Sequence, residues 1–230
     1  QTCEHVLAAL VGLDIDNASF VAGHSLGEYT ALCASESISL SDTAYILKMR
    51  GLFMQEAVPV GVGAMAAILG LSINDIKSLI DDVKVEGVCE IANDNEPNQI
   101  VISGNKLAIV KVCENAKLLG AKRAILLPVS APFHSSMMTP AQDRMTNLLS
   151  EIIIKKPKIP LISNITANAI QDPKQIRENL VKQITGRVRW RESILFMVNQ
   201  GVSEVFEIGP GKVLCNLIRR ITSQIDHNNI

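Results

Sequence analysis

The sequence has few of the features that mark nucleic-acid-binding and membrane proteins. Aromatic residues make up 3% of its 230 residues, so platforms on which bases could stack are not expected. An excess of one charge is also missing, because 22 basic residues face 23 acidic ones and the net charge is −1. No apolar run reaches the roughly 18 residues of a membrane span, and no signal-peptide pattern is visible. Binding to nucleic acid or to a membrane is therefore not expected.

Cysteines with the spacing of metal ligands are missing as well. The five cysteines are scattered and odd in number, and no two of them form a CxxC motif. A disulfide framework or a zinc site is not expected, and no metal or cofactor is predicted. The pattern favours a reducing compartment, and we expect the protein in the cytoplasm.

Apolar runs and amphipathic segments alternate along the chain. With 47% hydrophobic and 20% charged residues, most of the chain is expected to fold. Short buried strands are predicted at 19–22, 160–163 and 202–208. Helices are predicted at 4–11, at 28–34, from a cap at Ser41-Asp42 to Pro59, and at 136–153, 173–184, 191–199 and 213–221. Strands that alternate with helices favour a parallel sheet covered on both faces, and the tail at 226–230 is expected to fray.

The stretch from 61 to 128 has a different pattern. Strands are predicted at 64–70, 88–92, 100–103 and 123–127, helices at 73–83 and 106–119, and a polar turn at 93–98. This βαββαβ order is that of the ferredoxin-like split unit. We therefore expect a small subdomain at 61–128, inserted in a larger α/β catalytic subdomain formed by 1–60 and 129–230.

A Gly-x-Ser-x-Gly motif, Gly23-His24-Ser25-Leu26-Gly27, lies between a predicted strand and a predicted helix. This context is the one that a nucleophile elbow requires. The glycines are expected to keep side chains away from Ser25, and the first N–H groups of the helix point toward a developing oxyanion. We favour Ser25 as a nucleophile over a glycine turn with an incidental serine. His24 is predicted to pack beside the turn, because adjacent side chains diverge.

A serine nucleophile needs a base, and the sequence offers four histidines. His5 and His227 fall in terminal segments. His134 follows a predicted strand in a proline-stiffened loop, where a catalytic side chain can be held at the carboxyl edge of a sheet. By elimination we favour His134 as the base, over a role as a capping or surface residue.

Arg50 falls on the apolar face of its predicted helix, where its neighbours one turn away include Ile46 and Phe53. A buried guanidinium is costly unless it is paired. Three interpretations stay open: a side chain that extends to solvent, an ion pair with a carboxylate such as Glu28, and a bidentate site for a substrate carboxylate.

Two further patterns carry less weight. Gly209-Pro210-Gly211 before a helix could bind phosphate, but a tight turn is the simpler interpretation. Basic clusters such as 187–191 and 219–220 are expected to be solvated surface, some of which could dock an acidic partner.

Five motifs occur along the chain in the order in which one bacterial enzyme family has them. They are GHSLGEY at 23–29, MRG at 49–51, GAMAA at 63–67, PFHS at 132–135 and EIGPGKVL at 207–214. Together they closely resemble the malonyl-CoA:acyl-carrier-protein transacylases of type II fatty acid synthesis. The resemblance covers nearly the whole chain, and the combination is far more specific than the serine motif alone.

The resemblance implies an α/β-hydrolase-like parallel-sheet core with the ferredoxin-like insert, and a ping-pong reaction. Ser25 would attack the malonyl thioester of malonyl-CoA while His134 takes its proton. After CoA leaves, the phosphopantetheine thiol of acyl carrier protein would attack the malonyl-serine ester. The implied partners are thus malonyl-CoA and acyl carrier protein, without a cofactor.

The resemblance also implies roles for residues around this pair. Arg50 would hold the malonyl carboxylate. The backbone carbonyl of Gln183 would orient His134, in place of the aspartate of a conventional triad, and the Leu26 N–H would donate to the oxyanion.

Three more residues match positions on the substrate side of the family's site. Phe133 suits a malonyl rather than a branched methylmalonyl unit, by analogy with polyketide acyltransferases. Asn93 and Asn95 match positions that face the substrate cleft.

The resemblance departs from the family at one point, and other functions stay open. The family begins with a strand that ends in Gly-Gln-Gly and supplies a second oxyanion donor, whose loss typically costs about 10²–10³ in rate. The 230 residues hold no such segment. An inactive, N-terminally truncated fragment is therefore one alternative. A polyketide acyltransferase and a serine esterase with His227 as base are the others.

Overall fold

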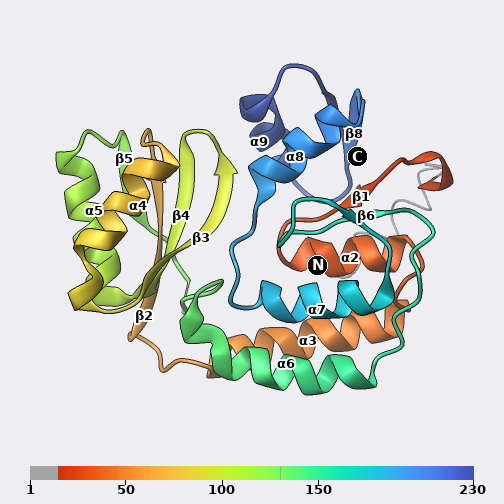
Figure 1. Ribbon diagram of the computed structural model, residues 1–230, viewed down its shortest axis with the longest axis horizontal. Helices are drawn as coiled ribbons and strands as arrows, with labels where there is room; N and C mark the ends of the chain where they lie inside the picture. Colours follow the sequence, from red (N-terminus) through yellow and green to blue (C-terminus); the bar gives the residue numbers. More distant parts are fainter. Residues whose placement is uncertain (1–14, 130) are drawn as a thin grey trace.

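The computed structural model describes residues 15–129 and 131–230, which form a mixed α/β structure with two lobes (Figure 1). We call residues 63–126 the small lobe and the other described residues the large lobe. The helix predicted at 4–11 lies outside the described residues. Within the described ranges, no helix is both long and apolar enough to cross a membrane.

The large lobe contains two small sheets. In the first, β1 (Val21–Ala22) pairs in parallel with β6 (Leu161–Ile162), which pairs antiparallel with β7 (Ala169–Ile170). In the second, β8 (Glu204–Glu207) pairs in parallel with β9 (Asp226–Asn229). The prediction of a frayed tail was wrong, because residues 226–229 make a ladder with β8. Parallel pairing is present, but it is divided between two sheets in the described part of the chain.

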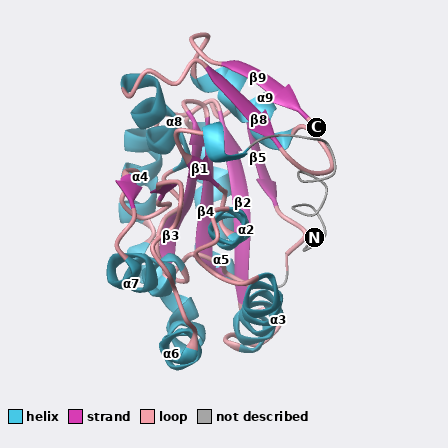
Figure 2. Ribbon diagram, turned by 90° about the vertical axis from the view of Figure 1, so that its right-hand side faces the viewer, coloured by secondary structure: helices cyan, strands magenta, loops and turns pink. Residues whose placement is uncertain are grey.

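Helices pack around these strands (Figure 2). They are α2 (Leu26–Ala34), α3 (Leu40–Glu56), α6 (Thr139–Glu151), α7 (Pro173–Gln183), α8 (Trp190–Asn199) and α9 (Val213–Ile221). The core that α2, α3, α6 and α7 share includes the fully buried Tyr29, Ile46 and Leu180. A separate core holds residues of α8 and α9, such as Ile194 and Ile218. The cap of α3 is Ser39 rather than the predicted Ser41-Asp42, because the Ser39 hydroxyl accepts a hydrogen bond from the Asp42 N–H at 3.0 Å.

The small lobe is a four-stranded antiparallel sheet in the order β3-β4-β2-β5, with two helices. Its elements are β2 (Gly63–Leu69), α4 (Ile73–Asp82), β3 (Cys89–Glu96), β4 (Gln99–Asn105), α5 (Lys106–Leu118) and β5 (Arg123–Leu126). The helices and the sheet enclose an aliphatic core that includes Ile68, Ile76 and Ile109. This arrangement leaves β3 at the edge of the sheet, facing the large lobe.

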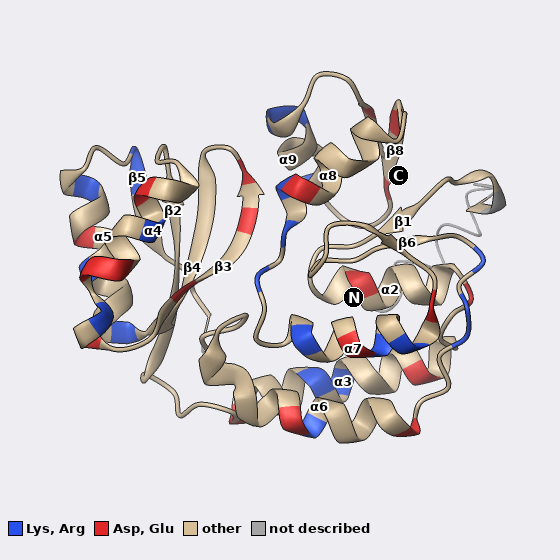
Figure 3. Cartoon of the chain, in the orientation of Figure 1, with Lys and Arg blue, Asp and Glu red and all other residues tan. Residues whose placement is uncertain are grey.

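The polar turn predicted at 93–98 was wrong for its first four residues, which continue β3. Their polar side chains are buried because the large lobe covers this edge. The Asp94 N–H donates to the carbonyl of Val188 at 2.9 Å, and the Asp94 carboxylate accepts two hydrogen bonds from Arg191, at 2.9 and 2.7 Å. Figure 3 shows acidic positions on β3 opposite basic positions near the start of α8.

Candidate active site

The Gly-x-Ser-x-Gly motif forms the turn between β1 and α2. Ser25 has φ 54° and ψ −107°, a backbone conformation that side-chain-bearing residues rarely adopt. A Cβ on Gly23 would lie 2.0 Å from the carbonyl carbon and oxygen of Gly27, so only glycine fits at position 23. A Cβ on Gly27 would meet no atom within 4 Å. Glycine is therefore required at position 23 by the Gly27 backbone rather than by the crowding of Ser25 that was expected, and position 27 has no such requirement.

Ser25 and His134 are brought together from positions 109 residues apart. The Ser25 hydroxyl lies 2.7 Å from Nε2 of His134, and Nδ1 of His134 lies 2.8 Å from the carbonyl oxygen of Gln183. Because a carbonyl can only accept, Nδ1 carries the proton and Nε2 is free to accept one from Ser25. The contact between His134 and the Gln183 carbonyl is the one that the resemblance implied.

The electrostatic surroundings keep His134 neutral. Burial lowers the pKa of His134 to about 3, and the positive charge of Arg50 acts in the same direction. The hydrogen bond to the Gln183 carbonyl opposes this shift, because it stabilises the imidazolium. At neutral pH the imidazole is therefore uncharged and able to accept a proton.

Arg50 is buried, with 7% of its surface exposed, so the interpretation that it extends to solvent was wrong. One of its terminal nitrogens, Nη2, lies 3.1 Å from the Ser25 hydroxyl and 3.1 Å from Oε1 of Gln183. Its Nε has no hydrogen-bond partner among the described residues. A guanidinium with a free donor thus points at the candidate nucleophile.

Among the described residues, Arg50 and Glu28 do not form the direct ion pair that was one interpretation of Arg50. The side-chain amide of Gln183 lies between Glu28 and Arg50: its Nε2 donates to Glu28 at 2.5 Å, and its Oε1 accepts from Arg50. Glu28 is fully buried, and burial raises the pKa of its carboxyl to about 7. The sequence showed Glu28 as a possible partner but gave no signal for the Gln183 side chain.

Asn164 is the residue of this site that the sequence did not reveal. Its Oδ1 accepts the Ser25 N–H at 2.7 Å, and its Nδ2 donates to the Gly23 carbonyl at 2.7 Å. Its own N–H donates to Glu28 at 3.2 Å. Asn164 lies in the loop after β6, 139 residues from Ser25, and no motif marks it.

Leu26 and Phe133 adjoin the Ser25–His134 pair along the chain. Leu26 is the first residue of α2, so its N–H has no acceptor within the helix. Phe133 packs against two clusters of buried residues, one that contains Met65 of the small lobe and one that contains Ala131 of the large lobe. These placements agree with positions at the edge of a site between the lobes.

Asn93 and Asn95 lie on β3 and are both buried. Nε2 of His24 donates to Oδ1 of Asn95 at 2.8 Å. Asn93 makes an isolated bridge with Val188 of the large lobe. His24 is thus held beside the turn, as predicted, and its ring lies 5.6 Å from that of Trp190.

A cavity of about 380 Å³ adjoins His134 between the two lobes. Its lining is mainly polar and comprises Glu90, Ile91, His134, Ser136, Thr139, Thr185 and Arg187. In the part of the chain that the structure describes, no cluster of three or more His, Cys, Asp or Glu side chains is arranged to hold a metal ion.

The sequence offered two other candidates, His227 as a base and the start of the helix after Gly211 as a phosphate site. His227 lies on β9, and its Nδ1 is 3.4 Å from the carbonyl of Ile225. At the start of α9, the Glu207 carboxylate accepts the N–H groups of Leu214 and Cys215 at 2.9 and 2.8 Å. This helix terminus is thus already occupied by an anion, which disfavours phosphate binding there.

Comparison with known sequences shows which proteins the chain is similar to. The acyl transferase domain family matches residues 11–229. The chain is 45% identical over 207 residues to malonyl CoA-acyl carrier protein transacylase of Bacillus subtilis (strain 168), covering 90% of the chain and 65% of that protein. It is 41% identical over 207 residues to the transacylase of Escherichia coli (strain K12), covering 90% of the chain and 67% of that protein. The chain thus spans about two thirds of the length of these relatives.

Solved structures give the same result. An acyl-carrier-protein S-malonyltransferase from Bartonella henselae superposes with a TM-score of 0.95 at 49% identity, covering 99% of this chain and 73% of that one. A malonyl-transacylase solved in complex with a type II polyketide synthase acyl-carrier protein superposes with a TM-score of 0.94 at 36% identity, covering 99% and 73%. On these matches, the chain belongs to the acyl transferase domain family.

Proposed function

We propose that the chain transfers a malonyl group from malonyl-CoA to the phosphopantetheine thiol of acyl carrier protein, in the fatty acid synthesis of the cytoplasm. The observation that carries the proposal is the convergence of His134 and Arg50 on one hydroxyl. The Ser25 oxygen lies 2.7 Å from the base and 3.1 Å from the guanidinium. A serine esterase needs the base, but an enzyme for an acyl group with a free carboxylate also needs a cation beside the nucleophile.

In the first half-reaction, the Ser25 hydroxyl gives its proton to Nε2 of His134 as its oxygen attacks the thioester carbonyl. The Leu26 N–H, at the start of α2, faces the developing oxyanion. The carbon–sulfur bond then breaks, and the departing CoA sulfur takes the proton from His134. The second half-reaction reverses these steps with the carrier-protein thiol, which gives its proton to His134 and displaces Ser25 from the ester.

Gln183 takes the place of the aspartate in a conventional triad. Its carbonyl holds the His134 tautomer and stabilises the imidazolium that forms in each half-reaction. A carbonyl is a weaker partner than a carboxylate, and the free imidazole is correspondingly hard to protonate.

Arg50 joins recognition to catalysis in this scheme. A malonyl carboxylate that pairs with its guanidinium would neutralise a charge that lowers the pKa of His134. The pKa of His134 would then rise, and its basicity with it, once the correct acyl group is bound. An acetyl group would not produce this change.

Phe133, Asn93 and Asn95 form the substrate side of the proposed site. Phe133 limits the acyl pocket to an unbranched malonyl unit, and the two asparagines face the cleft from β3. The contact between Asn95 and His24 ties this edge of the small lobe to the serine turn.

We also propose a finer description of the fold. The strand order β3-β4-β2-β5 with its two helices supports a ferredoxin-like subdomain at 61–128. The strand–turn–helix around Ser25 and the parallel β1–β6 pair support an α/β-hydrolase-like catalytic subdomain formed by 1–60 and 129–230.

Radiolabelled malonyl-CoA tests the proposal directly. The purified chain should acquire label on Ser25 and pass it to holo acyl carrier protein, and Ser25→Ala should abolish both steps. Arg50→Ala should reduce malonyl transfer at least 100-fold more than acetyl transfer, whereas Lys48→Ala, an exposed change on the same helix, should reduce neither. Equal losses for the two acyl groups would exclude the carboxylate role.

The same assay separates the alternatives. A chain that folds but takes no label is an inactive fragment. If His227→Ala abolishes the reaction and His134→Ala does not, the esterase alternative is favoured. Transfer to a polyketide carrier protein but not to a fatty acid one would place the chain in a polyketide pathway.

A further inference from the structure

The backbone of Ser25 needs external support. Its φ and ψ of 54° and −107° lie outside the common regions, and such residues persist where the surrounding structure fixes them. Gly23 leaves the space that the turn needs, but neither Gly23 nor Gly27 has a side chain that could fix the backbone of Ser25. The support must therefore come from residues that bond to the turn.

Asn164 bonds to both sides of the turn with one side-chain amide. Its oxygen accepts the Ser25 N–H and its nitrogen donates to the Gly23 carbonyl, each at 2.7 Å. The residue is buried, with 1% of its surface exposed, so water does not compete for these bonds. One amide thus sets the spacing between the carbonyl before the turn and the N–H of the serine.

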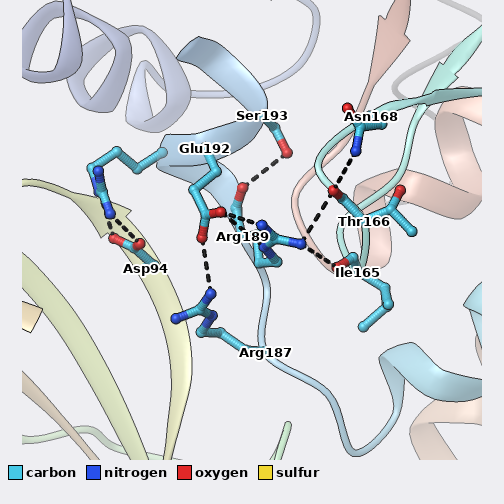
Figure 4. A network of polar contacts seen from close by, with 9 residues as sticks. Asp94, Ile165, Thr166, Asn168, Arg187, Arg189, Glu192 and Ser193 are labelled. Carbon is cyan, nitrogen blue, oxygen red and sulfur yellow. Dashed lines mark hydrogen bonds and ion pairs between the residues drawn. The ribbon is translucent and has the colours of Figure 1, made fainter. Parts of the chain in front are cut away.

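Arg189 holds the loop that carries Asn164. Its N–H donates to the Asn164 carbonyl at 3.0 Å. Its Nη1 donates to the carbonyls of Ile165 and Thr166 at 3.1 and 3.2 Å, as Figure 4 shows. Three successive carbonyls of one loop are therefore bound by one arginine.

Glu192 in turn fixes the side chain of Arg189. One carboxylate oxygen accepts from both Nε and Nη2 of Arg189, and the other accepts from Arg187 at 2.9 Å (Figure 4). The two arginines lower the pKa of Glu192, so it is charged at neutral pH. The contacts run without a break from Glu192 through Arg189 and Asn164 to the Ser25 backbone.

We propose that Asn164, supported by Arg189 and Glu192, is a positioning residue that holds the Ser25 backbone so that its hydroxyl stays aligned with His134. This inference rests on the proposed role of Ser25 as nucleophile. Asn164 bonds to the backbone on either side of the hydroxyl and to Glu28, and it acts on the reaction through Ser25.

A small serine-directed reagent tests the inference without the natural substrates. Diisopropyl fluorophosphate forms a bond from phosphorus to the Ser25 oxygen and releases fluoride, and mass spectrometry of the intact chain gives the rate. Asn164→Asp keeps the shape and the acceptor oxygen but places a second oxygen against the Gly23 carbonyl. We expect this variant to react about 10–100-fold more slowly, since small displacements of a reacting group have effects of this size.

The matched control is Asn168→Asp in the same loop. Asn168 is exposed, and its Nδ2 donates to the Thr166 carbonyl at 2.9 Å without touching the serine turn. This variant should react within about twofold of the wild-type rate. Glu192→Gln, which weakens the hold on Arg189, should fall between the two.

A pH profile separates positioning from a general loss of structure. A protonated aspartate at 164 can donate to the Gly23 carbonyl and accept from the Ser25 N–H, as the asparagine does, so lowering the pH should restore part of the reactivity of Asn164→Asp. His134 does not interfere, because its pKa is about 3. The Glu28 carboxyl faces Asn164 and also titrates, and a charge at position 164 would shift its pKa, so the two proteins are compared in a Glu28→Gln background that removes this titration.

The outcomes are distinct. A folded Asn164→Asp that reacts at the wild-type rate overturns the positioning role while leaving the proposed function intact. If Asn164→Asp does not fold, an unchanged rate in Glu192→Gln also overturns the role, and a slowed one supports it. A wild-type chain that reacts with the reagent but not with malonyl-CoA rejects the proposed function and leaves the positioning role standing. A wild-type Ser25 that reacts with neither overturns both.

Discussion

The ion pair between Asp94 and Arg191 predicts an asymmetric response to mutation. Asp94 on β3 is fully buried, whereas the Arg191 side chain on α8 keeps 25% of its surface exposed. Removal of the arginine strands a carboxylate that water cannot reach. Removal of the aspartate leaves a guanidinium that can turn to solvent.

The sizes of the two losses follow from this difference. Loss of one partner from a buried pair costs about 3–5 kcal/mol, so Arg191→Gln should lower the free energy of unfolding by about that amount. Asp94→Asn should cost about 1.5–3 kcal/mol, the value of hydrogen bonds to a charged group. The double variant should lose less free energy of unfolding than the sum of the two single losses, because its buried residue at position 94 carries no charge.

Urea unfolding followed by circular dichroism measures these free energies. Lys84→Gln is the control, because Lys84 pairs with Asp81 on the surface of α4 and should change the stability by less than about 1 kcal/mol. If Asp94→Asn proves as costly as Arg191→Gln, or if the two losses add fully, the argument from burial fails.

Three further predictions concern the active site. Because burial raises the pKa of Glu28 from 4.5 to about 7, its contribution to stability is fully present below about pH 4.5 and is lost as the pH rises through 7. The urea midpoint should therefore be lower at pH 8 than at pH 5, and this difference should disappear in Glu28→Gln. Because Arg50 helps to lower the pKa of His134, NMR titration of the imidazole should show a higher pKa in Arg50→Ala, and an unchanged pKa would contradict the electrostatic argument. Gly27→Ala should keep Ser25 reactive and the chain at least as stable, while Gly23→Ala should fail to form the turn; the reagent labelling described above distinguishes them, and similar behaviour of the two would refute the steric account.

Much of the site could be predicted because its signals are local. The serine turn needs a strand, a glycine and a helix within a few residues, and the position of Arg50 on the apolar face of α3 is visible in the spacing of apolar residues. The βαββαβ order also follows from local periodicity. These features depend on neighbours in the sequence and not on the packing of distant segments.

The residues that were missed depend on the packing of distant segments. The run from Asn93 to Glu96 is polar and was predicted to be a turn, but β3 continues there because Arg191 and Val188 satisfy its buried polar groups. Asn164 has no local signal, since its two partners at the serine turn lie about 140 residues away. Strand β9 was missed because it pairs with β8 rather than following its own apolar pattern.

Gln183 makes two separate sets of contacts in the site, one through its backbone carbonyl and one through its side-chain amide. Its carbonyl orients His134, and any residue could supply that atom. Its side chain, however, accepts from Arg50 and donates to both Glu28 and the Ser25 carbonyl, at 3.1, 2.5 and 2.9 Å. A glutamate would be repelled by Glu28, and a lysine would be repelled by Arg50. The amide meets both demands without a charge, so the orientation of the His134 ring and the placement of the Arg50 guanidinium are fixed by the same residue.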